Sequence, residues 1–463
     1  MTAGVVLYRV TNSRARWLAV VVAAGAAVLL AVPGQASAPR LSPVVRVQTP
    51  GMAGCHAESE TAVAQTSAGT WVGYNDLGAC QAADTVLGEH TSYLQLLPAG
   101  GGAGKVISLP ALGDRWGYAG DPALAPDVNG GVVFASLASV QTPQADPGSL
   151  ALSSATVRLE VLRVSPSGAV HRLPGVSRSA PFEDKEAVAV DRDPRSPHYG
   201  WVYLVWDDAV VSQVTMRAFD GHRWLPRVLI NDAAGGHPDV AIGSHGRIAV
   251  AYETQGGVEV RVASDPRRPL GAHIRALAGA DPGHINPTCP LINSVGLRQR
   301  VVRSPRLAWD SRDRLHLVAA LGGSGLATPA PTAGDSRVVH ALSSDAGLHW
   351  AQSALTEQTS WAPSIAALPS GDVAIGYLEL ADAAGRTFSA HVWRTHGGAV
   401  TVSPAVAALN QGTETQGSNY CYGLGDYTGI AALGSDVAYA WASTDGAAAP
   451  VYDTDVLVRH LTG

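Results

Sequence analysis

The chain has 463 residues, of which 46% are hydrophobic and only 15% are charged. Its formal net charge is -6, and it carries no basic stripe of the kind that phosphate binding requires, so we exclude a nucleic-acid partner. The 51 glycines and 29 prolines, together with the scarcity of lysine, are typical of many short strands joined by turns.

The N-terminal segment has the pattern of an export signal. Arginines precede an apolar run from Leu18 to Val32, which is short for a membrane span, and Ala36-Ser37-Ala38 then fits an A-x-A cleavage site. We predict a signal peptide over residues 1–38, cleaved near Ala38, and a secreted protein that keeps no stable membrane span after cleavage.

Seven short segments of the remaining chain share one pattern, in which a small residue or proline precedes an aliphatic residue and then an alanine. The alanines recur roughly every 60 residues, as in a repeat fold, and they are Ala64, Ala125, Ala189, Ala241, Ala308, Ala366 and Ala431. A strand that is apolar on both faces follows each segment, as expected for strands packed between neighbouring sheets. The pattern predicts an all-β fold over residues 39–463, a seven-bladed β-propeller with four-stranded antiparallel blades. A six-bladed ring is the alternative.

The last repeat supplies only three strands. A propeller must close its ring, because an open edge strand invites aggregation. The segment from Val44 to Val47 is the available β-branched stretch near the N-terminus. We therefore expect this N-terminal strand to complete the last blade.

Polar side chains stand where the first strand of each repeat begins, over the expected central channel. Several of these residue types are suited to sugar recognition, and we predict ligand contacts from Glu60, Asp76, Lys185, His237, Arg303, Trp361, Asp426 and Tyr427. Carboxylates in the same ring could serve acid–base chemistry, and the catalytic candidates are Asp121, Asp184, Asp207 and Glu253. Taken singly, each residue is more simply explained as a cap on the loop backbone. The convergence of so many polar groups is what favours function.

The sequence points to no cofactor and no metal ion. Asp76 and Asp426 could together hold Ca²⁺ with backbone carbonyls, but no ligand spacing beyond composition supports this. His237 alone is better explained as a hydrogen-bonded loop residue.

Four cysteines follow the export signal, and an even number in an exported protein indicates disulfides. The sequence has no C-x-x-C pair of the kind that binds metals. All four fall in loops on the face that carries the polar ring. We predict a short local bridge, Cys55–Cys80, and a longer one, Cys289–Cys421, that joins two loops across this face.

The stretch from Ser343 to Trp350, SSDAGLHW, resembles the Asp box of the sialidase-like (BNR/Asp-box) β-propeller superfamily, of the secreted bacterial type. His349 replaces the usual threonine, and Phe219 to Trp224 resembles a degenerate second copy. The resemblance implies a structural role for Ser343, Asp345, Gly347 and Trp350, in a turn between the third and fourth strands of a blade. Such turns lie on the face away from the usual active site.

The same resemblance implies how a sialidase would work: three arginines hold a carboxylate, a tyrosine activated by a glutamate attacks, and an aspartate is the acid–base. The Arg-Ile-Pro motif that normally carries the first arginine is absent from this sequence, and Arg303 alone occupies a strand start. We therefore expect a secreted monomer that recognises an extracellular glycan or glycoprotein without full sialidase chemistry. The alternatives are a glycoside hydrolase that uses the ring carboxylates and an extracellular protein-interaction scaffold.

Overall fold

The computed structural model describes residues 39–47, 58–76, 91–99, 103–113, 116–140, 156–176, 180–181, 183–208, 211–268, 270–279, 303–322, 336–381, 387–403, 406–407, 425–443 and 455–463. Pro39–Thr462 form one compact unit. Within the described residues, no helix has the length and hydropathy needed to cross a bilayer.

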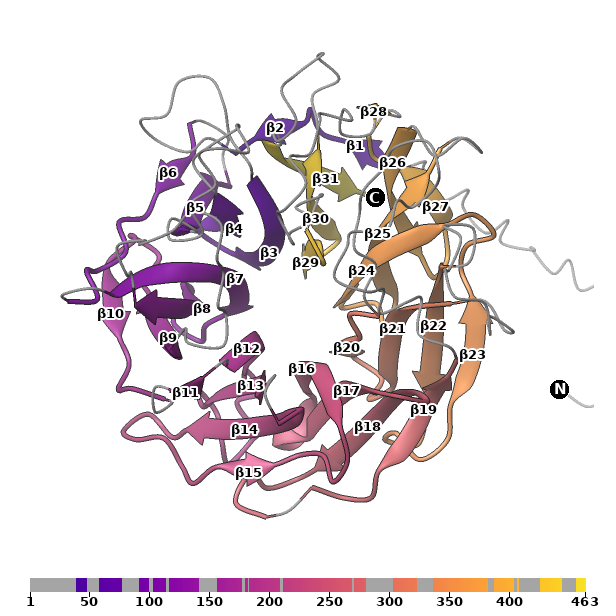
Figure 1. The fold of residues 1–463 in the computed structure, drawn as a ribbon. Helices are drawn as coiled ribbons and strands as arrows, with labels where there is room; N and C mark the ends of the chain where they lie inside the picture. Colours follow the sequence, from indigo (N-terminus) through magenta and orange to yellow (C-terminus); the bar gives the residue numbers. More distant parts are fainter. Residues whose placement is uncertain are drawn as a thin grey trace, which may run out of the picture. The chain divides into compact units, whose positions relative to one another are not determined.

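Seven antiparallel sheets surround a central channel in this unit (Figure 1). Blade one contains β3 (Glu58–Thr66), β4 (Gly69–Asp76), β5 (Thr91–Pro98) and β6 (Lys105–Val106). Blade two contains β7 (Trp116–Pro126), β8 (Val132–Val140), β9 (Thr156–Val164) and β10 (Val170–Arg172), with β11 (Ala180–Pro181) beside β9. Blade three contains β12 (Glu183–Val190), β13 (Val202–Asp208), β14 (Gln213–Phe219) and β15 (Val228–Leu229).

The remaining blades continue the same order. Blade four contains β16 (Gly235–Ile242), β17 (Ile248–Thr254), β18 (Gly257–Ala263) and β19 (Ile274–Ala278), with a 3-10 turn at Ser244–Gly246. Blade five contains β20 (Arg306–Trp309), β21 (Leu315–Leu321), β22 (Arg337–Ser343) and β23 (Ala351–Ala354). Blade six contains β24 (Ser360–Ala367), β25 (Val373–Leu380), β26 (Thr387–Arg394) and β27 (Gly398–Thr401), with β28 (Val406–Ala407) beside β26. Blade seven contains β29 (Gly429–Leu433), β30 (Asp436–Ser443) and β31 (Asp455–Thr462).

The first strand of every blade borders the channel, and the later strands follow outward (Figure 1). The seven-bladed prediction is therefore confirmed, and the six-bladed alternative is wrong. Each of the seven aligned alanines in the sequence belongs to one of these innermost strands, so the repeat identified from the sequence is the structural blade.

Strands from the N-terminus close the ring. Both β1 (Arg40–Leu41) and β2 (Val45–Arg46) pair antiparallel with β31, the outer strand contributed by the C-terminus. Val47 follows β2 and is almost fully buried. The predicted closure of the last blade by the N-terminal strand is confirmed, and its physical reason is that β31 would otherwise present an unpaired edge.

The hydrophobic core lies between neighbouring blades. Trp361 of blade six packs in one cluster with Tyr439 and Trp441 of blade seven, and all three side chains are buried. Gly376 makes this contact possible, because a Cβ atom there would lie 2.3 Å from the Tyr439 ring. Small residues on the inner strands thus let large aromatic side chains of the next blade approach closely, which fixes the blades around the channel.

Candidate functional site

The innermost strands share a backbone irregularity at one end of the channel. Six of the seven carry a residue other than glycine with positive φ at the equivalent position, four residues before the aligned alanine; these are Glu60, Asp121, Lys185, His237, Ser304 and Ala362, with φ between 39° and 52°. In five of these strands the pairing register shifts at the same point. Left-handed backbone of this kind is sparsely populated and concentrates at functional sites. We call this end of the channel the mouth.

Bulges of this type change where side chains point. In a regular strand, successive side chains alternate between two faces, whereas an extra residue in a bulge re-aims its side chain. In β12 the register shifts between Asp184 and Ala187, so Lys185 and Glu186 lie within the irregular stretch. Both side chains are buried.

Lys185 of blade three meets Tyr427 of blade seven. The Nζ atom of Lys185 lies 3.0 Å from the centroid of the Tyr427 ring, and the guanidinium of Arg306 lies 5.1 Å from the same ring. Cations are attracted to the face of an aromatic ring by its quadrupole. Tyr427 occupies in blade seven the position that carries positive φ in the other blades. Its own φ is not positive, and its ring contacts Lys185.

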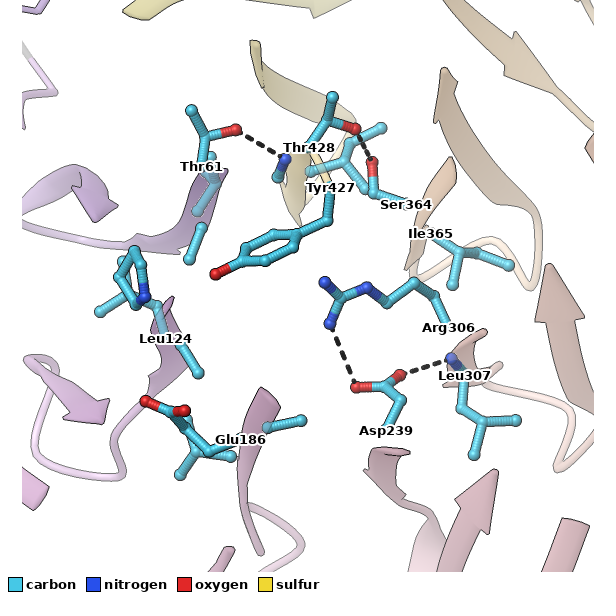
Figure 2. A pocket seen from close by; sticks show the side chains of 18 of the residues that line it. Thr61, Leu124, Glu186, Asp239, Arg306, Leu307, Ser364, Ile365, Tyr427 and Thr428 are labelled. Carbon is cyan, nitrogen blue, oxygen red and sulfur yellow. Dashed lines mark hydrogen bonds and ion pairs between the residues drawn. The ribbon is translucent and has the colours of Figure 1, made fainter. Parts of the chain in front are cut away.

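A polar cavity of about 180 Å³ lies in the channel beside this contact. Figure 2 shows the side chains of Glu186, Tyr427, Arg306 and Asp239 directed toward it from separate blades. Arg306 Nη1 lies 3.6 Å from Asp239 Oδ1, and Asp239 Oδ2 accepts a 2.7 Å hydrogen bond from the Leu307 amide. The positive charge of Arg306 is therefore compensated inside the protein.

Glu186 differs in its hydrogen bonding from Asp239, the other carboxylate that lines the cavity. Its side chain is 5% exposed, and neither carboxylate oxygen has a hydrogen-bond partner in the described part of the chain. Burial, reinforced by the nearby charge of Asp121, raises the pKa of Glu186 well above its usual value. Burial thus favours the neutral form of the carboxyl group, and a protonated carboxylic acid can donate a hydrogen bond as well as accept one.

Two catalytic candidates lie side by side on neighbouring strands of blade three. Asp184 and Asp207 are paired residues of β12 and β13. Burial, with the charges of Asp121 and Asp207, raises the pKa of Asp184 to about 7, and burial raises the pKa of Asp207 to about 6. The structure therefore brings together two carboxyl groups that titrate near neutrality.

The neighbouring blade supplies a charged pair to the same region. His237 Nδ1 lies 3.4 Å from Glu253 Oε2, while the His237 amide donates a 2.9 Å hydrogen bond to Asp207. Burial lowers the pKa of His237, but the carboxylates of Glu253 and Asp207 outweigh it and raise the pKa overall. Burial likewise raises the pKa of Glu253, and His237 outweighs it so that the pKa is lowered. Each of the two groups therefore favours the charged form of the other.

Other residues expected at the mouth have different surroundings. Arg303 is 1% exposed and donates from Nη1 to the carbonyls of Thr254 and Gly257, so its guanidinium holds backbone rather than facing the cavity. Trp361 lies in the core between blades six and seven.

The acidic residues expected at the mouth are also placed. Glu60 accepts a 2.7 Å hydrogen bond from Asn75. Asp76, the last residue of β4, and Asp426, shortly before β29, are both buried. Within the described ranges no group of three or more His, Cys, Asp and Glu side chains could hold a metal ion. Cys55, Cys80, Cys289 and Cys421 lie outside the described residues.

The turn from Ser343 to Trp350 joins β22 to β23, the third and fourth strands of blade five. Asp345 Oδ1 accepts hydrogen bonds from Ser343 Oγ (2.8 Å) and from the His349 amide (2.9 Å). Trp350 Nε1 donates to the Gly347 carbonyl at 2.9 Å. The polar groups of this turn bond to one another, as a structural role requires.

Sequence reasoning missed Glu186, Asp239 and Arg306 as cavity residues. A signal for them exists in the repeat itself. Three positions before the aligned alanine, Glu186 is the only charged residue among the seven repeats, and two positions before it only Asp239 and Arg306 are charged. Reading each column of the repeat across all blades would have found all three.

The chain matches no known protein family and no curated protein. Solved structures with a similar fold include a protein of unknown function from Dyadobacter fermentans, 11% identical, covering 92% of this chain and 99% of that chain with a TM-score of 0.48. The Hadza microbial sialidase Hz136 is 14% identical over 70% of this chain and 63% of that chain, with a TM-score of 0.46. An α-L-arabinanase from Penicillium chrysogenum, complexed with arabinobiose, is 13% identical over 74% and 93% of the two chains, with a TM-score of 0.43. These similarities concern the fold alone.

Proposed function

We propose that the mouth binds the terminal residue of a neutral extracellular glycan, without complete sialidase chemistry. The observation that carries this proposal is the buried carboxyl group of Glu186, whose two oxygens lack partners among the described residues and which lines the channel cavity. A buried polar group without a partner costs stability, and such groups persist where a ligand or a reaction uses them.

The size and charge of the cavity limit what can enter. At about 180 Å³ it is smaller than the pockets that enclose drug-sized ligands, so one sugar ring would enter end-on while the rest of the glycan stays outside. Arg306 is compensated by Asp239, and the carboxylates of Asp121 and Glu60 add negative charge nearby. A sugar that carries a carboxylate would be repelled by this surplus of acids.

The proposal includes the location of the protein. The predicted signal peptide over residues 1–38, the secreted monomer and the relationship of the Ser343–Trp350 turn to the Asp box belong to it. Mass spectrometry of the protein from the culture medium tests the first of these, because cleavage near Ala38 fixes the N-terminal mass.

Binding to immobilised neutral and anionic glycans tests the proposed ligand class. We expect the wild-type protein to retain neutral glycans, and Glu186→Gln to weaken binding about tenfold through loss of one strong hydrogen bond. Glu357→Gln is the matched control, since Glu357 is exposed. Retention of anionic glycans alone would contradict the proposal, and binding of no glycan would favour a protein-interaction scaffold.

Glycoside hydrolysis is the second candidate function, and the Asp184–Asp207 pair favours it. An acid–base catalyst works best when its pKa lies near the working pH, which the values of about 7 and about 6 satisfy. A panel of fluorogenic glycosides tests it. We expect Asp184→Asn and Asp207→Asn each to abolish any turnover, and turnover that survives both substitutions would exclude these catalytic residues.

A further inference from the structure

Three side chains that line the channel cavity keep hydrogen-bonding capacity that the protein itself does not use. They are Glu186 of blade three, Arg306 of blade five and Tyr427 of blade seven, and Figure 2 shows all three directed toward the cavity. Both carboxyl oxygens of Glu186 and the Nε atom of Arg306 lack a hydrogen-bond partner within the described ranges. The ion pair of Arg306 with Asp239, at 3.6 Å, compensates its charge but leaves most of its five N–H donors available.

The ring of Tyr427 is held in place, whereas its hydroxyl group is not bonded. The side chain is buried, with Lys185 Nζ 3.0 Å and the Arg306 guanidinium 5.1 Å from the ring centroid. In the described part of the chain the hydroxyl group makes no hydrogen bond. Burial raises the pKa of Tyr427 well above its usual value, so the hydroxyl keeps its proton and can both donate and accept. A group that is positioned before the ligand arrives loses little entropy on binding.

Tyr203 shows that a missing partner alone does not mark a binding site. Its hydroxyl group is also buried and also lacks a partner among the residues that the structure describes. The side chain of Tyr203, however, packs in the core between blades three and four and does not line the cavity. Tyr427 differs because it meets Arg306 and Glu186 around one space that a ligand can enter.

We propose that Tyr427 determines the specificity of the mouth, and that with Arg306 and Glu186 it binds two neighbouring free hydroxyl groups on the leading edge of the terminal sugar. Because it describes a contact inside the glycan site, this role rests on the proposed function. Arg306 can only donate, so it takes a sugar oxygen as its acceptor, while Glu186 and Tyr427 can accept the sugar hydroxyl protons. A sugar whose hydroxyl groups are missing or capped there would leave buried polar groups unpaired and would be rejected.

NMR titration with simple glycosides tests this role. The probes are the methyl glycosides of glucose, galactose, mannose and arabinose, together with the derivatives of each in which one hydroxyl group is removed or O-methylated. We expect the wild-type protein to bind at least one parent glycoside. It should bind the derivatives altered at the contacted hydroxyl groups about tenfold or more weakly, because the groups built to bond them lose their partners.

One substitution assigns the contact to Tyr427. Tyr427→Phe removes the hydroxyl group and keeps the ring on Lys185. It should weaken binding of the parent glycoside about tenfold, and it should bind that parent and one of the rejected derivatives with equal affinity, since the partner of the altered hydroxyl group is already gone. Tyr203→Phe is the matched control, because it makes the same chemical change at a buried hydroxyl group outside the cavity. It should keep the affinity and the discrimination of the wild type.

The possible failures can be told apart. If Tyr427→Phe discriminates between the parent glycoside and every derivative as the wild type does, the role of Tyr427 is overturned and the proposed function stands. If the wild type binds a parent glycoside and all its derivatives equally, the role is overturned without any variant, whatever the stability of Tyr427→Phe. Binding of none of the parent glycosides would contradict the proposed function itself.

Discussion

Two regions of the protein differ in how their buried carboxyl groups are hydrogen-bonded: the mouth, and a polar cluster around Asp310 in blade five. In the turn between β20 and β21, Asp310 accepts hydrogen bonds from the amides of Arg312 and Arg314, from Arg314 Nε and from His316, and His316 bonds to His340. At the mouth, Glu186 has no hydrogen-bond partner among the described residues. We call the first set the Asp310 cluster.

This difference indicates that the Asp310 cluster contributes to stability and that the mouth contributes to function. A buried network whose members are all satisfied rigidifies a fold, whereas an unsatisfied group costs stability and persists for another reason. The Asp310 cluster should therefore stabilise blade five, and the mouth should weaken the ring that carries it. Changes to the strands that close the ring, and then to each of the two regions, test that contrast.

Deletion of residues 39–50 should have the largest effect. It removes β1 and β2 and leaves β31 unpaired along its outer edge. We expect the melting temperature to fall by about 10 °C or more. The strand pairing with β31 and the burial of Val47 together contribute several kcal/mol of stability, and both are lost. Circular dichroism melting curves measure this, and an unchanged curve would show that the N-terminal strands do not close the ring.

Substitutions in the two regions should change stability with opposite signs. Asp310→Ala should lower the free energy of unfolding by about 3 kcal/mol, because several donors lose their acceptor. Glu186→Leu should raise it by about 1 kcal/mol, because a buried polar group without partners is replaced by an apolar one. Urea unfolding measures both, with Glu357→Gln as the control that should change nothing. The same sign for both substitutions would break the contrast.

Acid should destabilise the Asp310 cluster. Burial, with the charge of His316, lowers the pKa of His340 to about 4, below its unfolded value near 6.5. The unfolded chain therefore binds the proton more readily, and stability is lost as the pH falls from about 6.5 to about 4. His340→Phe should remove about 2 kcal/mol of this loss, as measured by unfolding at pH 7 and pH 4.5. His222→Phe, at an exposed histidine, should leave the loss as it is in the wild type.

At the mouth the pH dependence should run the other way. The pKa of Asp184 is raised to about 7, so folding favours the protonated form, and stability falls as the pH rises from about 4 to about 7. Asp184→Asn should therefore be more stable than the wild type at pH 8 and equal to it at pH 3. Asp184 and Asp207 share this titration, so the pH dependence belongs to the pair. Equal stability of the two proteins at pH 8 would refute this.

The frame could be predicted from the sequence because its signal repeats. Each innermost strand carries the same order of aliphatic residue and alanine, and the seventh blade visibly lacks a strand that Val44 to Val47 could supply. Packing between neighbouring blades imposes this pattern seven times. A strand that is ambiguous in one repeat can therefore be identified by alignment with the other six.

The cavity residues depend on local backbone that the pattern does not specify. The sequence placed Lys185 and Tyr427 at the mouth, but their contact depends on where the bulge in β12 directs the Lys185 side chain. Arg303 and Trp361 were expected at the mouth from their position in the repeat, yet Arg303 bonds to nearby carbonyls and Trp361 packs in the core. Position in a repeat fixes the strand end and leaves the direction of a long side chain open.

The pairing of Arg40 with Thr462 has a consequence for how the chain folds. These residues are separated by almost the whole sequence, so the contact is among the least local that the fold can make, and non-local contacts slow folding. Each of blades one to six is built from one continuous stretch of the chain, but the seventh stays incomplete until β31 meets β1 and β2. The two N-terminal strands therefore stay unpaired until β31 is in place.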